Sequence, residues 1–169
     1  MDASFLTRQL TDNATRIEAL VRGVSPQEAM WKPDRDTWSI LEVVNHLYDE
    51  EREDFRVRLD IILNHPKEPW PGIDPEGWVT ERKYNQRDLE DSLKNFLTER
   101  QASLDWLRTL EEPNWNAPYQ AHFGSIRAGD VFTSWVTHDH IHMRQSVELH
   151  RALTAHKAEP FRLDYAGTW

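Results

Sequence analysis

His138 and His142 form the residue pair in this chain whose spacing is best suited to hold a metal ion. They stand four residues apart in the segment SWVTHDHIHMRQS, where the apolar residues follow a helical spacing. Side chains at this spacing project from one helical face, one turn apart, so a single helix can supply two ligands. His46, in the segment WSILEVVNHLYDEE, could supply a third. Three neutral imidazoles would leave one coordination position open, which is typical of a catalytic metal site.

A third histidine in the same segment cannot join the pair. His140 lies about 160° around the helix axis from both His138 and His142, so it faces away from any metal that they hold. Such a pair also arises by chance in a chain with eight histidines. From spacing alone, a metal site and two ordinary interior histidines with satisfied hydrogen bonds are both open interpretations.

Carboxylates beside these histidines could take part in the chemistry. Glu50 stands one turn after His46 on the same helical face and could be a general base, a further ligand or a solvated acid. Asp139 lies within an apolar stripe, where an unpaired carboxylate would be costly. It could orient a ligating histidine, or it could form a core ion pair, for example with Arg100. Glu51 interrupts another apolar stripe and also needs a partner.

Helical periodicity dominates the chain and no strand pattern competes with it. Ser39 and Glu42 form a capping box that opens the helix carrying His46. We predict an all-α four-helix bundle as a single domain over residues 1–169, with a long loop or crossover after the second helix. The predicted segments are four long helices (about 4–23, 39–64, 82–110 and 126–155), a short helix near 25–31, loops at 65–80 and 112–126, and an irregular end from 157 to 169.

Composition restricts the function further. The formal net charge of −9 over 169 residues argues against binding to nucleic acids and to anionic membranes, both of which favour basic surfaces. The chain has no cysteine, so disulfides, thiolate ligands and a protein thiol nucleophile are impossible. No apolar run is long enough to span a membrane, and the first residues do not have the pattern of a signal peptide. We therefore expect a cytoplasmic protein.

Two segments resemble the DinB/YfiT-like metal-binding four-helix bundles. Trp31-Lys-Pro, followed by WSILEVVNHL from Trp38, is similar to the family pattern W-x-P and W-S-i-x-e-v-x-x-H-L, and HDHIHMRQ is similar to H-x-x-x-H-x-x-Q. The resemblance implies an unusual connectivity in which the second and fourth helices bring His46, His138 and His142 together. It also implies one divalent metal on these histidines, zinc or nickel foremost, with water completing the shell.

The same resemblance implies a homodimer and, in some relatives, transferase or isomerase activity with a low-molecular-weight thiol. Our first hypothesis is a metal-dependent enzyme in which such a thiol attacks a small-molecule substrate in a pocket walled by Trp38 and Trp135. Glu50 or Asp139 would then orient or deprotonate the reactants. The alternatives are a hydrolase that uses the same site, and a non-enzymatic stress-response or binding module in which the metal only stabilises the bundle.

Overall fold

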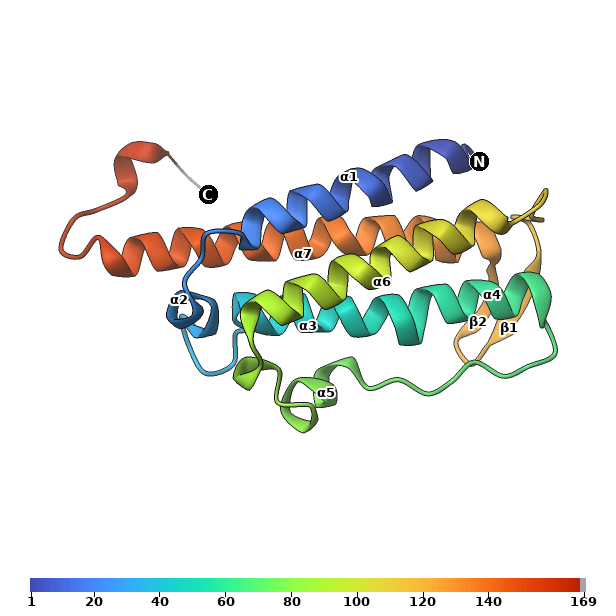
Figure 1. The fold of residues 1–169 in the computed structure, drawn as a ribbon, viewed down its shortest axis with the longest axis horizontal. Coiled ribbons are helices and arrows are strands. Elements are labelled where there is room, and N and C mark those ends of the chain that lie inside the picture. The colour runs from blue at the N-terminus through green and yellow to red at the C-terminus, as the bar shows by residue number, and fades with distance from the viewer. Residues whose placement is uncertain (168–169) are drawn as a thin grey trace.

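The computed structural model describes residues 1–167, which form an all-α bundle with one small hairpin (Figure 1). The predicted fold class and the four long helices are therefore confirmed. In chain order, the long helical segments are α1 (Ala3–Val21), α3 (Ile40–Glu50) with the π-helical turn η1 (Glu51–Phe55) and α4 (Arg56–Asn64), α6 (Leu89–Thr109), and α7 (Ala128–Lys157). The short elements are α2 (Pro26–Met30), α5 (Pro75–Glu81), the 3₁₀ turns η2 (Tyr84–Gln86) and η3 (Asp164–Ala166), and the strands β1 (Pro118–Ala121) and β2 (Gly124–Arg127).

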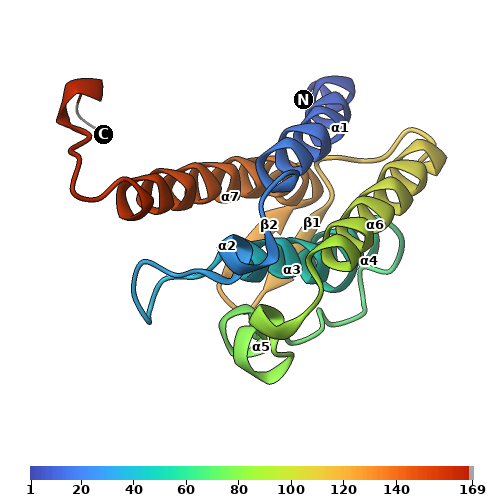
Figure 2. The ribbon, with the colours of Figure 1, turned by 60° about the vertical axis from the view of Figure 1, so that its left-hand side comes forward.

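The order of the helices around the bundle differs from their order along the chain. Helix α1 packs against α6 and α7, and the α3–α4 segment packs against the same two helices (Figure 2). The long connection after α4 crosses back along the bundle before α6 begins, so that α6 runs parallel to α3–α4 (Figure 1). This connectivity places the second and fourth long segments side by side, as the histidines require.

Two of the predicted loops contain short regular elements. Asp74 caps α5 through its side chain, which accepts a hydrogen bond from the backbone N–H of Gly77, and Pro75 is the first helical residue. Asp88 caps α6 in the same way, so that this helix begins at Leu89 rather than near residue 82. The strands of the hairpin are four residues each and pair antiparallel from Pro118–Arg127 to Ala121–Gly124. Strands this short leave no reliable periodic signal in the sequence.

The segment after α7 contains little regular structure. The segment predicted to be irregular beyond residue 157 is so apart from η3, and residues 168 and 169 lie outside the described part of the chain. No helix within residues 1–167 combines the length and the apolar composition needed to cross a membrane.

The centre of the bundle is a layer of buried charge between two apolar clusters. Arg100 on α6 donates two hydrogen bonds to Asp139 on α7, at 2.8 and 2.9 Å, and a third from Nε to Glu51 on η1 at 2.6 Å. Asn13 on α1 donates to Asp139 at 3.1 Å, so all four long segments contribute to this layer. All four side chains are buried. The core ion pair between Asp139 and Arg100 is thereby confirmed, and Glu51 has the partner that its burial demands.

Replacement of Ser39 by alanine should destabilise the fold by about 1–2 kcal/mol, because Ser39 caps α3 in a fully buried position. Its hydroxyl accepts from the backbone N–H of Glu42 at 3.1 Å and donates to Asn85 at 2.6 Å. Ser25→Ala removes an equivalent capping box from the five-residue α2 and should cost less. Urea unfolding of the two variants measures the difference, and equal costs would contradict a special role for Ser39.

Candidate metal centre

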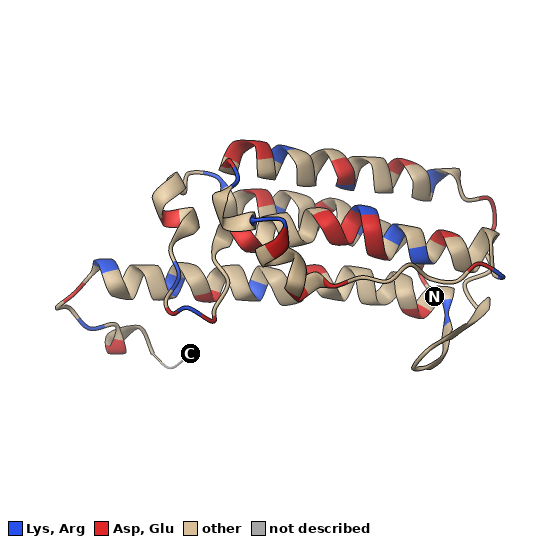
Figure 3. Ribbon diagram, turned by 90° about the horizontal axis from the view of Figure 1, so that it is seen from below, with Lys and Arg blue, Asp and Glu red and all other residues tan. Residues whose placement is uncertain are grey.

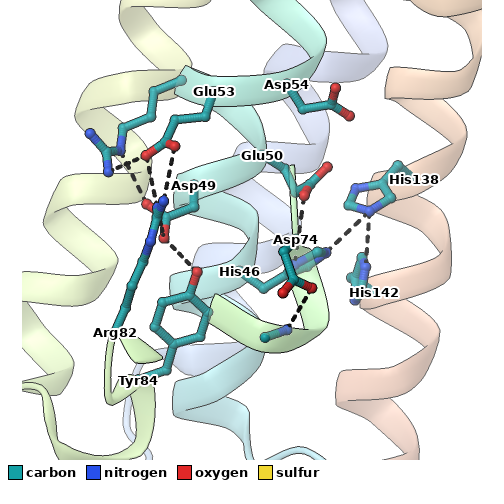
Figure 4. A network of polar contacts seen from close by, with 12 residues as sticks. His46, Asp49, Glu50, Glu53, Asp54, Asp74, Arg82, Tyr84, His138 and His142 are labelled. Atoms are coloured by element: carbon teal, nitrogen blue, oxygen red, sulfur yellow. Dashed lines mark hydrogen bonds and ion pairs between the residues drawn. The ribbon is translucent and has the colours of Figure 1, made fainter. Parts of the chain in front are cut away.

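Three histidines from two neighbouring helices converge on one point (Figure 4). Nε2 of His138 lies 3.2 Å from Nε2 of His46, which comes from α3, and 3.1 Å from Nε2 of His142, one turn further along α7. Within the described part of the chain, this is the one group of three or more potential ligand residues whose donor atoms lie within 4.8 Å of one another. The structure thus brings together the three histidines singled out from spacing.

Burial keeps these imidazoles in the neutral form that a metal requires. Burial, followed by the neighbouring His142 and His138, lowers the pKa of His46 to about 2. Burial and then His142 and Arg100 lower the pKa of His138 to about 3. Burial also lowers the pKa of His142, although Gln145 and Asp139 oppose the shift. At neutral pH each ring therefore keeps a nitrogen lone pair for coordination.

The donor set fits a divalent metal. Ligands about 2.0–2.1 Å from a tetrahedral zinc ion lie about 3.3 Å from one another, close to the separations of 3.1 and 3.2 Å between the imidazole nitrogens. Nδ1 of His142 lies 2.8 Å from Oε1 of Gln145. An amide oxygen can only accept, so Nδ1 carries the proton and Nε2 faces the other two histidines with its lone pair. The role of Gln145 was not anticipated from the sequence.

Glu50 is the carboxylate nearest to the three histidines. Its Oε1 lies 4.0 Å from Nδ1 of His46, one helical turn away. Burial, followed by the charge of Asp54 and a hydrogen bond with it, raises the pKa of Glu50 to about 8. Glu50 faces the histidines while the next residue, Glu51, reaches Arg100 in the core.

A polar network links the crossover between α4 and α6 to α3 and η1, next to the histidines. Arg82, which follows α5, donates two hydrogen bonds to Glu53 at 2.8 and 3.0 Å and pairs with Asp49 at 2.7 Å. The hydroxyl of Tyr84 donates to Asp49 as well. Figure 4 shows this network on one side of α3 and the histidines on the other, with Asp74 in front of His46. The crossover thereby supplies one wall of the site.

The histidines open into a pocket of about 460 Å³. Trp38 forms part of its wall, with its ring centroid 4.9 Å from that of His46 and its ring stacked on His142 at 6.2 Å. The pocket is lined by residues from α3 and the segment just before it, from α7, and from the start of α5: Trp38, His46, Glu50, Asp74, Pro75, Glu76, His138 and His142. Asp74, Pro75 and Glu76 were missed in the sequence, where residues 65–80 showed only a loop.

Two residues predicted to serve the site point into the core instead. Asp139 is 1% exposed and held by Arg100, so it is an internal ion-pair partner and not a group that meets substrate. Trp135 is also 1% exposed, and its indole N–H donates to Glu51 at 2.8 Å. Neither side chain lines the pocket. Both residues occupy positions of α7 that face the bundle axis, whereas His138 and His142 face the pocket between α7 and α3.

Comparison with known proteins supports the predicted family and fold. YfiT from Bacillus subtilis, described as a probable metal-dependent hydrolase with an unusual four-helix bundle topology, superposes with a TM-score of 0.78 at 18% sequence identity. The match covers 89% of this chain and 86% of that chain. No curated protein sequence matches this chain. The sequence profile of the DinB superfamily matches residues 9–146, which include all three histidines. The chain therefore belongs to the DinB superfamily.

Proposed function

We propose that His46, His138 and His142 hold one divalent metal, and that the protein is a metal-dependent hydrolase of a small molecule bound in the adjacent pocket. The observation that carries the proposal is the convergence of three neutral imidazole nitrogens at the base of an open pocket. The description of YfiT as a probable metal-dependent hydrolase supports the same reaction class. A metal with three protein ligands would supply Lewis-acid chemistry at its remaining position.

The protein's own groups have separate tasks in this proposal. The three histidines would hold the metal. Gln145 fixes the tautomer of His142 by accepting a hydrogen bond from its Nδ1–H. Glu50 lies at the edge of the same space and is suited to take a proton from an attacking water and return it to the leaving group. Its raised pKa holds the proton near neutral pH, and a nearby divalent charge would favour the ionised, accepting form. Trp38 provides an apolar wall against the histidines.

Replacement of Glu50 by glutamine should leave metal content unchanged and lower the turnover of hydrolysed substrates by about 100-fold or more, because glutamine cannot accept the proton. The measurement is a panel of p-nitrophenyl esters and anilides assayed with the zinc-loaded protein. Asp60→Asn, on α4 and away from the pocket, is the matched control and should turn over at the wild-type rate. Wild-type turnover by the Glu50→Gln variant would contradict the assigned role.

The two other functions predicted from the sequence are tested by the same assay. Thiol transfer would use the same histidines, but its turnover would depend on an added low-molecular-weight thiol, whereas hydrolysis would not. A binding or stress-response module would hold the metal without turnover of any substrate in the panel. Three further predictions concern the identity of the metal as zinc or nickel, a homodimeric state and a cytoplasmic location. Elemental analysis would test the first of these, and sedimentation would test the second.

A further inference from the structure

The walls of the metal pocket carry acidic groups and no basic ones. Three of the eight lining residues are carboxylates, Glu50, Asp74 and Glu76, and none is a lysine or an arginine. The arginines of this region are engaged elsewhere, since Arg82 pairs with Asp49 and Glu53, and Arg58 pairs with Asp54. The acidic residues that concentrate along the middle of the α3–α4 segment (Figure 3) are mostly paired with these and other arginines, so the carboxylates that line the pocket dominate its field. A ligand that enters therefore meets a negative field.

A buried acceptor within the pocket lacks a donor. The side chain of Glu50 is 6% exposed, and no N–H or O–H group of the described residues donates to its Oε1. A buried carboxylate oxygen without a donor is costly, so native proteins rarely keep one unless a ligand or water satisfies it. Glu50 lines the same pocket as Asp74 and Glu76, and Nδ1 of His46 comes no closer to this oxygen than 4.0 Å, beyond hydrogen-bond distance. It is a second feature, independent of the exposed acids at the mouth, that indicates a ligand with N–H or cationic character.

An aromatic ring stands beside these carboxylates. Trp38 lines the same pocket and is only partly buried. Indole faces attract ammonium and guanidinium groups through the ring quadrupole, and the attraction strengthens where carboxylates share the site. The combination of one indole wall with acids at the mouth and in the depth is suited to a small organic cation.

We propose that the pocket selects substrates that carry a positive charge, an ammonium or a guanidinium group, close to the bond that is hydrolysed. The cation would lie between Trp38 and the carboxylates of Asp74 and Glu76, and the reactive bond would face the histidines. The placement of the reactive bond at the histidines rests on the proposed hydrolase function. The binding of the cation by Trp38, Asp74 and Glu76 does not.

The charge of a bound metal does not reverse this preference. The two carboxylates at the mouth, Asp74 and Glu76, balance the charge of a divalent ion, and neutral imidazole ligands add none. Asp74 and Glu76 are exposed at the mouth and meet an incoming ligand before the metal does. An anionic substrate, including a carboxylate-bearing thiol, would have to pass both.

The test compares two probes of similar shape and opposite charge, benzyltrimethylammonium and benzylsulfonate, in low-salt buffer at neutral pH. Neither probe is a good metal ligand, so direct coordination does not confuse the comparison. Binding is measured by calorimetry on the zinc-loaded and on the chelated protein. We expect the cation to bind at least about tenfold more tightly than the anion, and the preference to shrink as salt is added.

A matched pair of double variants tests whether Asp74 and Glu76 supply the negative charge that attracts the cation. Asp74→Asn with Glu76→Gln removes both mouth charges, and asparagine still caps α5. Asp88→Asn with Glu90→Gln makes the same changes at the same two positions of α6, outside the pocket. The first pair should weaken cation binding by about tenfold, and the second should leave it unchanged.

Several results would overturn the inference: no saturable binding of the cation, equal affinity for both probes, or equal losses in the two double variants. These outcomes are separate from failure of the proposed function. A protein that binds no zinc, or that hydrolyses nothing, would remove the hydrolase proposal, and the chelated protein would still decide whether the pocket prefers cations.

Discussion

Replacement of His142 by alanine should reduce the metal content of the purified protein from about one ion per chain to a small fraction of that. The loss follows from geometry, because only two imidazoles would remain, and no carboxylate belongs to the group of ligand atoms that lie within 4.8 Å of one another. The measurement is elemental analysis after loading with zinc or nickel and removal of free ions. Circular dichroism before and after loading shows whether the variant keeps the helical bundle.

His140→Ala is the matched control for this experiment. His140 lies on the same helix two residues from both ligands but is exposed on the opposite face, so its removal should leave the metal content unchanged. Full metal in the His142→Ala protein would exclude the three-histidine site. Loss of metal from both variants would mean that α7 itself is perturbed, and the site assignment would then lack support.

Replacement of Arg100 by methionine should destabilise the fold by about 3–5 kcal/mol, the second large effect that we expect. Arg100 is 1% exposed and is the common partner of Glu51 and Asp139, so its removal leaves two buried carboxylates facing each other. Urea unfolding followed by tryptophan fluorescence measures the loss. Arg108→Met, on the same helix with an exposed ion pair to Asp105, should cost less than about 1 kcal/mol.

A third variant separates the cost of an unpaired charge from the value of the ion pair itself. Simultaneous replacement of Arg100, Glu51 and Asp139 by methionine, glutamine and leucine removes the charges together and should recover much of the lost stability. If Arg100→Met were no worse than Arg108→Met, the charged layer would contribute nothing to the fold. Metal content should survive in the triple variant, because none of the three side chains lines the pocket.

The parts of this structure that could be predicted are those encoded by local patterns. Apolar spacing and the capping box at Ser39 located the long helices, because both depend on neighbouring residues only. The spacing of His138 and His142 predicted a shared face for the same reason, and His140 is indeed exposed. The polar interruption at Glu51 predicted a partner, which the structure identifies as Arg100.

The remaining features depend on contacts between residues far apart in the chain. The pairing of Asp139 with Arg100 spans 39 residues, and two alternatives for Asp139 were open until the helices were placed. Trp135 resembled a pocket wall in the sequence because burial against a core and burial against a ligand produce the same pattern. Asp74 lines the pocket of the histidines only because the crossover folds back over α3, and no periodicity within residues 65–80 encodes that path.

The π turn at Glu51–Phe55 has a consequence for comparing this chain with its relatives. A π turn arises when a helix accommodates one additional residue without changing the helices on either side. A relative that lacks this residue would have a continuous α-helix there, and an ungapped alignment anchored on His46 would pair each residue of α4 with one about 100° away around the axis. Homologues should therefore be aligned with a single-residue gap allowed in this turn, or the buried residues of α4, such as Leu59 and Ile62, will be matched to residues on another face.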